Sequence, residues 1–571
     1  MSSSLVNILG YVLLFPVFVL DVVIYVVLFL LGNTHKTKKT QYSTARGEAT
    51  KTRSAPRSSS NSSSSSSLTS IFCVDGDNHD SETIYEMTQR AVTLHGDNRV
   101  AMRSRKFIEL RKKHKEDKFP SKIYDDDKGY DELTYRELGR VTEQFGKGLR
   151  ALGLKKSASD DDSSLSSDKL VIFENTCAIW TLAEQGAMSQ SLPVATCYAT
   201  LGRDAVVQAV CETQAAALLV NWKDVKDFVQ LAKEKKMPSL RVLIASTHEL
   251  GRNDTFNSSD FDNDKNNPLK VVTSDEVIAM GKTADYQPVP PKPSDVAVIM
   301  YTSGSTGKPK GVVMKHSSLV AGIAGMAANV EIKPGSGTFV SYLPLAHILA
   351  LQVEHVLLSY GATLCYSDPH QLSTALGQFE PTIFAGVPKV YEILKAGLEK
   401  KIHGGPTALR VIFQTLLAWK LYVAKQFGVT HTPVSNRFFD LIRKKVFGRH
   451  LEFAVTGGGP MSADLHDFFR ACFGRPLIQG YALTETCVGG CFQALEDERN
   501  GVVGPPVSCV EVSLQSEPDL TDSHGNPYLH TDRVGSKGEP ILGRGEIIMR
   551  GPSVSSGYFQ NPEKTAEEFD Q

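Results

Sequence analysis

The sequence predicts an α/β fold built on mostly parallel sheets, and two observations carry this prediction. Short apolar runs alternate with segments of helical composition, such as residues 205–214, and the alternation resumes after Pro293. Strands that alternate with helices in this way are typical of parallel sheets covered by helices on both faces. We therefore expect two α/β lobes. The strand candidates, in order, are residues 170–173, 216–220, 240–244, 296–300, 338–342, 382–385 and 451–456.

Helix start signals place three further elements. Residues 133–138 open a helical stretch, and Ser462 can cap a second helix directly after the strand at 451–456. Asn561 followed by Pro562 predicts the start of a last helix, because proline suits the first helical position. The apolar face of the helix after Ser462 would hold Leu465, Phe468, Phe469 and Cys472.

Composition excludes several classes of protein. The 571 residues carry 62 Lys and Arg against 63 Asp and Glu, a balance that argues against a nucleic-acid-binding protein. The nine cysteines lack the dense, regular spacing of a disulfide scaffold, so a reducing compartment is expected. Small secreted, collagenous and wholly disordered proteins are excluded as well.

The N-terminal segment predicts a membrane anchor. Residues 5–31 are almost all apolar, which is long enough for a helix to cross a bilayer. A cleaved signal peptide fits poorly, because no basic residue precedes the run. A shallow hairpin in one leaflet is an alternative, because Asp21 is costly to place inside a bilayer and Pro16 could bend the helix. The basic residues that follow place the C-terminal part in the cytosol: His35, Lys36, Lys38 and Lys39. We expect the membrane to be that of the endoplasmic reticulum or of another cytosol-facing organelle.

Three parts of the chain follow from these patterns. Residues 1–34 form the predicted anchor, and residues 35–75 form a Ser-rich, disordered linker too polar to bury a core. Residues 76–571 form the globular part.

Residues 301–311 have the composition of a phosphate-binding loop. Two glycines let the backbone fold closely around an anion, while hydroxyls and lysines supply donors and positive charge. An apolar strand precedes the loop directly, which makes a plain surface linker a weak alternative. A mononucleotide P-loop is excluded, because Gly304 and Gly307 are too close and Pro309 stands where Ser or Thr should hold magnesium.

The loop at 301–311 resembles the signature of the adenylate-forming (AMP-binding) superfamily, which joins carboxylic acids to AMP. Residues 456–460 resemble the family's adenine-side glycine turn, and residues 479–485 its Tyr-Gly-Leu-Thr-Glu motif, with Ala482 in place of Gly. Residues 197–202 and 342–347 are similar to long-chain acyl-CoA synthetases in particular. The resemblance covers roughly residue 84 to the end of the chain and makes residues 76–571 an AMP-binding adenylation domain.

The resemblance implies ATP-dependent activation of long-chain fatty acids to acyl-CoA through an acyl-adenylate. The implied substrates are fatty acid, ATP and coenzyme A, with Mg²⁺ as metal. Glu485 would hold the metal and, with Thr484 and Lys310, form the catalytic group. The nucleotide would be bound by Thr302, Ser303, Gly304, Ser305, Thr306, Gly307, Gly457, Gly458, Gln479, Gly480 and Tyr481.

Two further residue sets have a plain structural alternative. His347 follows Pro344 in a motif that borders the acyl site in the family, and it is equally compatible with a hydrogen-bonded core histidine. Cys487 and Cys491 form a lone C-x₃-C pair, for which zinc binding is improbable and buried thiols are the default.

The resemblance also predicts the fold in more detail, as two α/β lobes plus a smaller β-rich part. Gln571 falls inside the last predicted helix, so we expect the family's small C-terminal domain, with its adenylating Lys, to be absent. Two alternatives stay open: a ligase for another carboxylic acid, and a non-catalytic fragment that binds nucleotide or acyl ligand.

Overall fold

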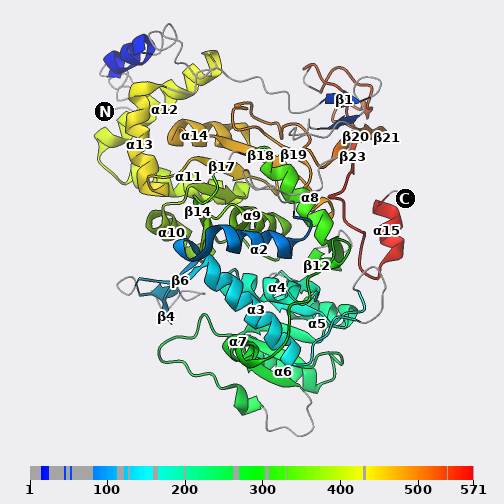
Figure 1. The fold of residues 1–571 in the computed structure, drawn as a ribbon. Coiled ribbons are helices and arrows are strands. Elements are labelled where there is room, and N and C mark those ends of the chain that lie inside the picture. The colour runs from blue at the N-terminus through cyan, green and yellow to red at the C-terminus, as the bar shows by residue number, and fades with distance from the viewer. Residues whose placement is uncertain are drawn as a thin grey trace. The chain divides into compact units, whose positions relative to one another are not determined.

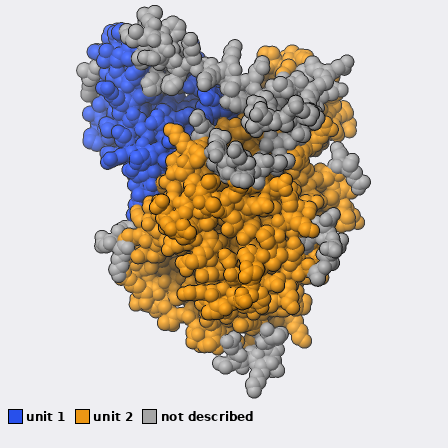
Figure 2. Space-filling view, in the orientation of Figure 1, with its two compact units in different colours: residues 1–41, 373–481, 491–505 blue, residues 42–372, 482–490, 506–571 orange. Residues whose placement is uncertain are grey.

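The computed structural model describes most of the globular part of the chain, which forms two compact units (Figure 2). Unit 1 comprises residues 1–41, 373–481 and 491–505, and unit 2 comprises residues 42–372, 482–490 and 506–571. The described residues are 14–24, 44–46, 52–54, 81–111, 121–125, 129–157, 165–198, 201–261, 269–302, 308–330, 332–427, 432–536 and 538–569.

Unit 2 contains a seven-stranded sheet in the order β11-β10-β9-β7-β8-β12-β13. Its strands pair in parallel except β13, which runs antiparallel to β12. The strands are β7 (Leu170–Phe173), β8 (Val194–Thr196), β9 (Ala217–Asn221), β10 (Val242–Ser246), β11 (Lys270–Thr273), β12 (Val296–Thr302) and β13 (Lys310–Lys315). The intervening helices are α4 (Ala178–Met188), α5 (Gly202–Thr213), α6 (Val225–Lys233) and α7 (Ser274–Thr283) (Figure 1). The predicted alternation of strand and helix is confirmed.

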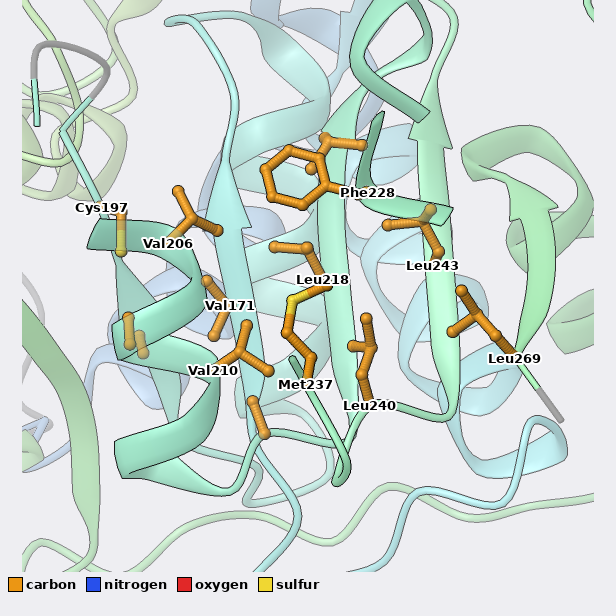
Figure 3. Close-up of a cluster of buried hydrophobic side chains, with 14 of the residues drawn as sticks. Val171, Cys197, Val206, Val210, Leu218, Phe228, Met237, Leu240, Leu243 and Leu269 are labelled. Atoms are coloured by element: carbon orange, nitrogen blue, oxygen red, sulfur yellow. The ribbon is translucent and has the colours of Figure 1, made fainter. Parts of the chain in front are cut away.

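One face of this sheet is covered by α5 and α6. Figure 3 shows Val206 and Val210 of α5 and Phe228 of α6 packed over Leu218 of β9 and Leu243 of β10. All five side chains are buried, which explains why these strands read as continuous apolar runs.

A second group of strands in unit 2 has the order β14-β15-β3-β6. β14, β15 and β3 pair in parallel, and β6 is antiparallel to β3. These strands are β14 (Thr338–Ser341), β15 (Thr363–Tyr366), β3 (Val100–Arg105) and β6 (Tyr130–Thr134). The remaining long helices of unit 2 are α2 (Ile84–His95), α3 (Tyr135–Ala151), α8 (His316–Ala327) and α9 (Ile348–Ser359).

The helix predicted from residue 133 begins two residues later, at Tyr135. Thr134 forms a capping box, because its side chain accepts from the backbone N–H of Glu137 while Glu137 accepts from the backbone N–H of Thr134. The preceding residues pair with β3 as β6. The cap, and not the apolar pattern, decides where this helix begins.

A small β-rich part of unit 2 has the strand order β1-β2-β20-β23, all antiparallel. It consists of β1 (Thr44–Arg46), β2 (Thr52–Ser54), β20 (Glu511–Gln515) and β23 (Glu546–Arg550). β1 and β2 lie within the predicted disordered linker, where β2 pairs with the edge of β20 and β1 pairs with β2. Two hairpins complete the unit, β4 (Phe107–Arg111) with β5 (Ser121–Tyr124) and β21 (Glu517–Thr521) with β22 (Pro527–Tyr528).

Unit 1 holds the strands β16 (Ile383–Gly386), β17 (Phe453–Thr456), β18 (Leu477–Tyr481) and β19 (Cys491–Phe492). β16, β17 and β18 are parallel, and β19 is antiparallel to β18. Ser462 caps α14 (Ala463–Phe473) by accepting from the backbone N–H of Leu465, as predicted. The other helices include α11 (Pro388–His403), α12 (Thr407–Phe427) and α13 (Pro433–Phe447).

Part of the predicted anchor is described, as a helix at residues 14–24 in unit 1. The ring of Phe18 stacks on Trp419 of α12, with 4.7 Å between centroids. Asp21 is only 2% exposed and accepts from the backbone N–H of Val434 at 2.6 Å and from the hydroxyl of Ser435, in the first turn of α13. Among the residues described here, no helix has both the length and the apolar character that a bilayer span requires. The rest of the predicted anchor lies outside the described residues.

Candidate active site

The predicted phosphate loop connects the two strands of a β-hairpin. Thr302, the last residue of β12, pairs with Lys310, the first residue of β13. The loop therefore leads from a strand into an antiparallel strand, whereas a mononucleotide P-loop leads into a helix. The exclusion of a P-loop is confirmed. Five of the predicted nucleotide-binding residues lie outside the described part of the chain: Ser303, Gly304, Ser305, Thr306 and Gly307.

A distant segment, residues 555–559, lies alongside β13. The backbone N–H of Val313 donates to Gly557 at 2.9 Å, and the N–H of Phe559 donates to Gly311 at 2.7 Å. Tyr558 forms an antiparallel bridge with Val312. These backbone contacts hold the segment against β13 and bring Tyr558 to the end of the phosphate loop.

Tyr558 connects the loop to the predicted metal ligand. Its hydroxyl donates to Oε1 of Glu485 at 2.8 Å. Its ring centroid lies 5.3 Å from Nζ of Lys310. Burial, followed by the hydrogen bond to Glu485, raises the pKa of Tyr558, so the hydroxyl remains a donor at neutral pH. Lys310 and Glu485, more than 170 residues apart in sequence, thus meet around one aromatic ring in unit 2.

The loop that carries Glu485 is held from three directions. Thr484 and Glu485 open the short helix η6 (Thr484–Thr486), and Cys487 then turns the chain with φ +47°. Nε2 of Gln352 on α9 donates to the carbonyl of Cys487 at 3.1 Å. Gly322 of α8 lies so close that a Cβ there would be 2.0 Å from the same carbonyl.

The third restraint on this loop comes from the segment at 555–559. The backbone N–H of Ser555 donates to the carbonyl of Glu485 at 2.7 Å. Glu485 is therefore fixed at its backbone by Ser555 and at its side chain by Tyr558.

The Glu485 carboxylate suits Mg²⁺. Its Oε1 accepts from Tyr558, and its Oε2 accepts no hydrogen bond from any residue that the structure describes. Across the described ranges, no group of three or more His, Cys, Asp or Glu side chains is placed to hold a metal ion. Mg²⁺ commonly takes one or two carboxylates and completes its coordination with water and substrate phosphates. A single half-buried carboxylate beside the phosphate loop fits that donor set.

The predicted adenosine-side residues lie in unit 1. Gly457 and Gly458 follow β17, and Gly458 has φ +74°, a left-handed conformation that favours glycine. Gly480 and Tyr481 end β18, which is parallel to β17. The turn and the tyrosine therefore lie at the carboxyl ends of neighbouring parallel strands, where α/β sheets bind ligands.

Two of these residues also have a clear structural role. Oε1 of Gln479 accepts from the backbone N–H of Met461 at 3.1 Å, which ties the glycine turn to β18. A Cβ at Gly480 would be 2.7 Å from the Phe492 ring of β19, so close packing alone requires a glycine there. Their predicted contacts with nucleotide stay predictions.

His347 caps α9, because its Nδ1 accepts from the backbone N–H of Leu349 at 3.4 Å. Tyr342, Pro344 and Ala346 of the same motif line a cavity of about 830 Å³ in unit 2, whereas His347 does not. His347 is therefore hydrogen-bonded but exposed, so it is not the core histidine of the alternative interpretation, and its contact with substrate stays a prediction.

The same cavity contains an ionic network that sequence reasoning missed. Nζ of Lys122 lies 2.6 Å from carboxylate oxygens of both Glu249 and Asp368. The three residues come from β5, from the chain after β10 and from the chain after β15. No local pattern in the sequence signals a cluster assembled from such distant segments.

Comparison with known proteins gives the family. Residues 112–559 match the family described as AMP-binding enzyme, over most of the chain. The chain belongs to this family. The predicted membership of the adenylate-forming (AMP-binding) superfamily is thereby confirmed.

Two curated relatives and one solved structure illustrate the likeness. Long chain acyl-CoA synthetase 8 of Arabidopsis thaliana is 32% identical over 70% of this chain. Palmitoyl-CoA ligase FUM16 of Gibberella moniliformis is 28% identical over 85% of this chain. This AMP-binding enzyme spans 55% and 69% of the respective lengths of these relatives.

The solved structure is the N-terminal domain of FACL13 from Mycobacterium tuberculosis. It superimposes with a TM-score of 0.55 at 18% identity, over 86% of this chain and 94% of that chain. At this identity the likeness concerns the fold alone. It agrees with the predicted N-terminal domain of an adenylate-forming fold.

Proposed function

We propose that this AMP-binding enzyme activates long-chain fatty acids to acyl-CoA through an acyl-adenylate, with ATP and coenzyme A as substrates. The observation that carries the proposal is the convergence of Lys310, Glu485 and Tyr558 at the phosphate hairpin in a chain of this family. The choice of acid is supported by relatives named long chain acyl-CoA synthetase and palmitoyl-CoA ligase.

The reaction is an in-line displacement at the α-phosphate of ATP by the fatty-acid carboxylate, which releases pyrophosphate. The thiolate of coenzyme A then attacks the acyl carbon and AMP leaves. No covalent bond to the protein forms, so the chain acts by positioning and by stabilising charge. Lys310 donates to the departing phosphates, and Glu485 would hold Mg²⁺. The metal, when bound, neutralises negative charge on the phosphates.

Product analysis tests the proposal. The transcript is first sequenced through the codon for Gln571, and the full product of the gene is produced. The protein is then supplied with MgATP, coenzyme A and one of three acids: palmitate, acetate or benzoate. We expect AMP, pyrophosphate and palmitoyl-CoA in equal amounts, and little product with the other two acids. Faster turnover of acetate or benzoate would favour a ligase for another acid. No thioester with any acid would favour a non-catalytic binding role.

We also propose that the N-terminal segment attaches the enzyme to a membrane with its bulk in the cytosol, on the endoplasmic reticulum or another organelle. The apolar residues 5–31 and the basic residues after them support this. Alkaline carbonate extraction should leave the protein in the pellet, and added protease should digest its C-terminal part in intact microsomes. Release into the supernatant, or protection of the C-terminal part, would contradict the proposal.

A further inference from the structure

We propose that Tyr558 is a positioning residue that sets the orientation of the Glu485 carboxylate for Mg²⁺. The inference deepens the proposed function and rests on it for the identity of the metal. Its basis is the 2.8 Å hydrogen bond from the Tyr558 hydroxyl to Oε1 of Glu485. This bond engages one oxygen of the carboxylate and directs the other away from the tyrosine.

The backbone on both sides of Tyr558 holds its ring in place. The backbone N–H of Val313 donates to the carbonyl of Gly557, and the carbonyl of Gly311 accepts from the backbone N–H of Phe559; Gly557 and Phe559 are the two neighbours of the tyrosine. The backbone N–H of Tyr558 donates to Oγ1 of Thr565 at 3.0 Å, which lies in α15 (Pro562–Glu568). The ring is thus fixed between the phosphate hairpin and the last helix, and its hydroxyl has a defined position.

Glu485 lacks a comparable restraint on its side chain from other described residues. Its backbone carbonyl is held by Ser555, but its carboxylate accepts a hydrogen bond from Tyr558 alone among the residues that the structure describes. A carboxylate on a flexible side chain loses rotamer entropy when it binds a metal. A hydrogen bond that holds the productive rotamer beforehand lowers this cost. Residues that orient metal ligands in this way are worth about 10- to 100-fold in metal affinity.

The experiment measures binding of ATP by the 571-residue chain as a function of Mg²⁺ concentration, for the wild type and for Tyr558→Phe. We expect the Mg²⁺ concentration that half-saturates nucleotide binding to rise about tenfold in Tyr558→Phe. ATP binding without Mg²⁺ and the melting temperature should change little. The matched control is Tyr135→Phe, which removes a hydroxyl that donates to the carbonyl of Ala362 at 2.8 Å, far from Glu485 in sequence.

A second variant makes the result specific to Glu485. Glu485→Gln should abolish the Mg²⁺ dependence, and Tyr558→Phe should add no further loss in that background. Wild-type Mg²⁺ dependence in Tyr558→Phe, an additive loss in the double variant, or ATP binding by the wild type that is independent of Mg²⁺ would each overturn the inference. Fatty acid is absent from this assay, so a failure of the proposed acyl-CoA synthesis leaves its outcome unaffected.

Discussion

Gly322→Ala tests whether α8 positions the loop that carries Glu485. A Cβ at Gly322 would lie 2.0 Å from the carbonyl oxygen of Cys487, whereas ordinary contacts begin at 3.4 Å. The carbonyl belongs to backbone two residues after Glu485, so either the loop or the helix must move by more than an ångström. The same movement stretches the 3.1 Å hydrogen bond from Gln352. Overpacking of this kind costs about 1–3 kcal/mol of folding free energy.

A matched variant separates loss of stability from loss of the site. Gly148→Ala in α3 places a Cβ 2.0 Å from the carbonyl oxygen of Val277 in α7, which is the same clash away from the predicted site residues. Urea unfolding should show similar destabilisation of both variants. Titration with MgATP should show about tenfold weaker binding, or about 1.4 kcal/mol, for Gly322→Ala alone. Equal MgATP affinity in the two variants would refute the positioning role of α8.

Three further predictions concern charge and pH. Lys310→Ala should weaken ATP binding about tenfold or more, since a hydrogen bond to a charged group is worth about 1.5–3 kcal/mol. Lys315→Ala, at the other end of β13, should leave ATP binding unchanged. Equal ATP affinities of the two variants would remove Lys310 from the site. Glu485→Gln should keep the melting temperature yet lose palmitate-dependent pyrophosphate release, and wild-type rates would disprove the metal assignment. Burial lowers the pKa of His316 from 6.5 to about 3, so its contribution to stability is present above pH 6.5 and declines as the pH falls towards 3. By pH 5 the free energy of unfolding should have fallen by about 2 kcal/mol because of His316. His316→Asn can still accept from the backbone N–H of Ile84 and should abolish this pH-dependent loss. If the pH profile of urea unfolding is the same in His316→Asn as in the wild type, the prediction is wrong.

Local signals in the sequence were enough to place several of the regular elements. The strand predicted at residues 170–173 is β7, and the helix start at Asn561 and Pro562 is that of α15, whose first turn is capped by Asn561. Apolar runs and capping residues act over a few residues, so they can be read without knowledge of the fold.

The parts of the site that depend on long-range contacts could not be predicted. Tyr558 reaches Glu485 only because residues 555–559 pair with β13, more than 240 residues earlier in the chain. Gly480 was assigned to nucleotide from its motif, yet the Phe492 ring already requires a glycine there. A motif shows which residue types occur together, while the contacts that restrict each one come from elements far away in the sequence.

Detection of the reaction intermediate tests the central claim most directly. The full product of the gene is incubated with MgATP and palmitate in the absence of coenzyme A, quenched, and analysed by mass spectrometry. The proposed mechanism predicts that palmitoyl-adenylate accumulates on the protein, is absent with Glu485→Gln, and is converted to palmitoyl-CoA and AMP when coenzyme A is added. Formation of palmitoyl-CoA together with ADP and phosphate, without any palmitoyl-adenylate, would contradict it.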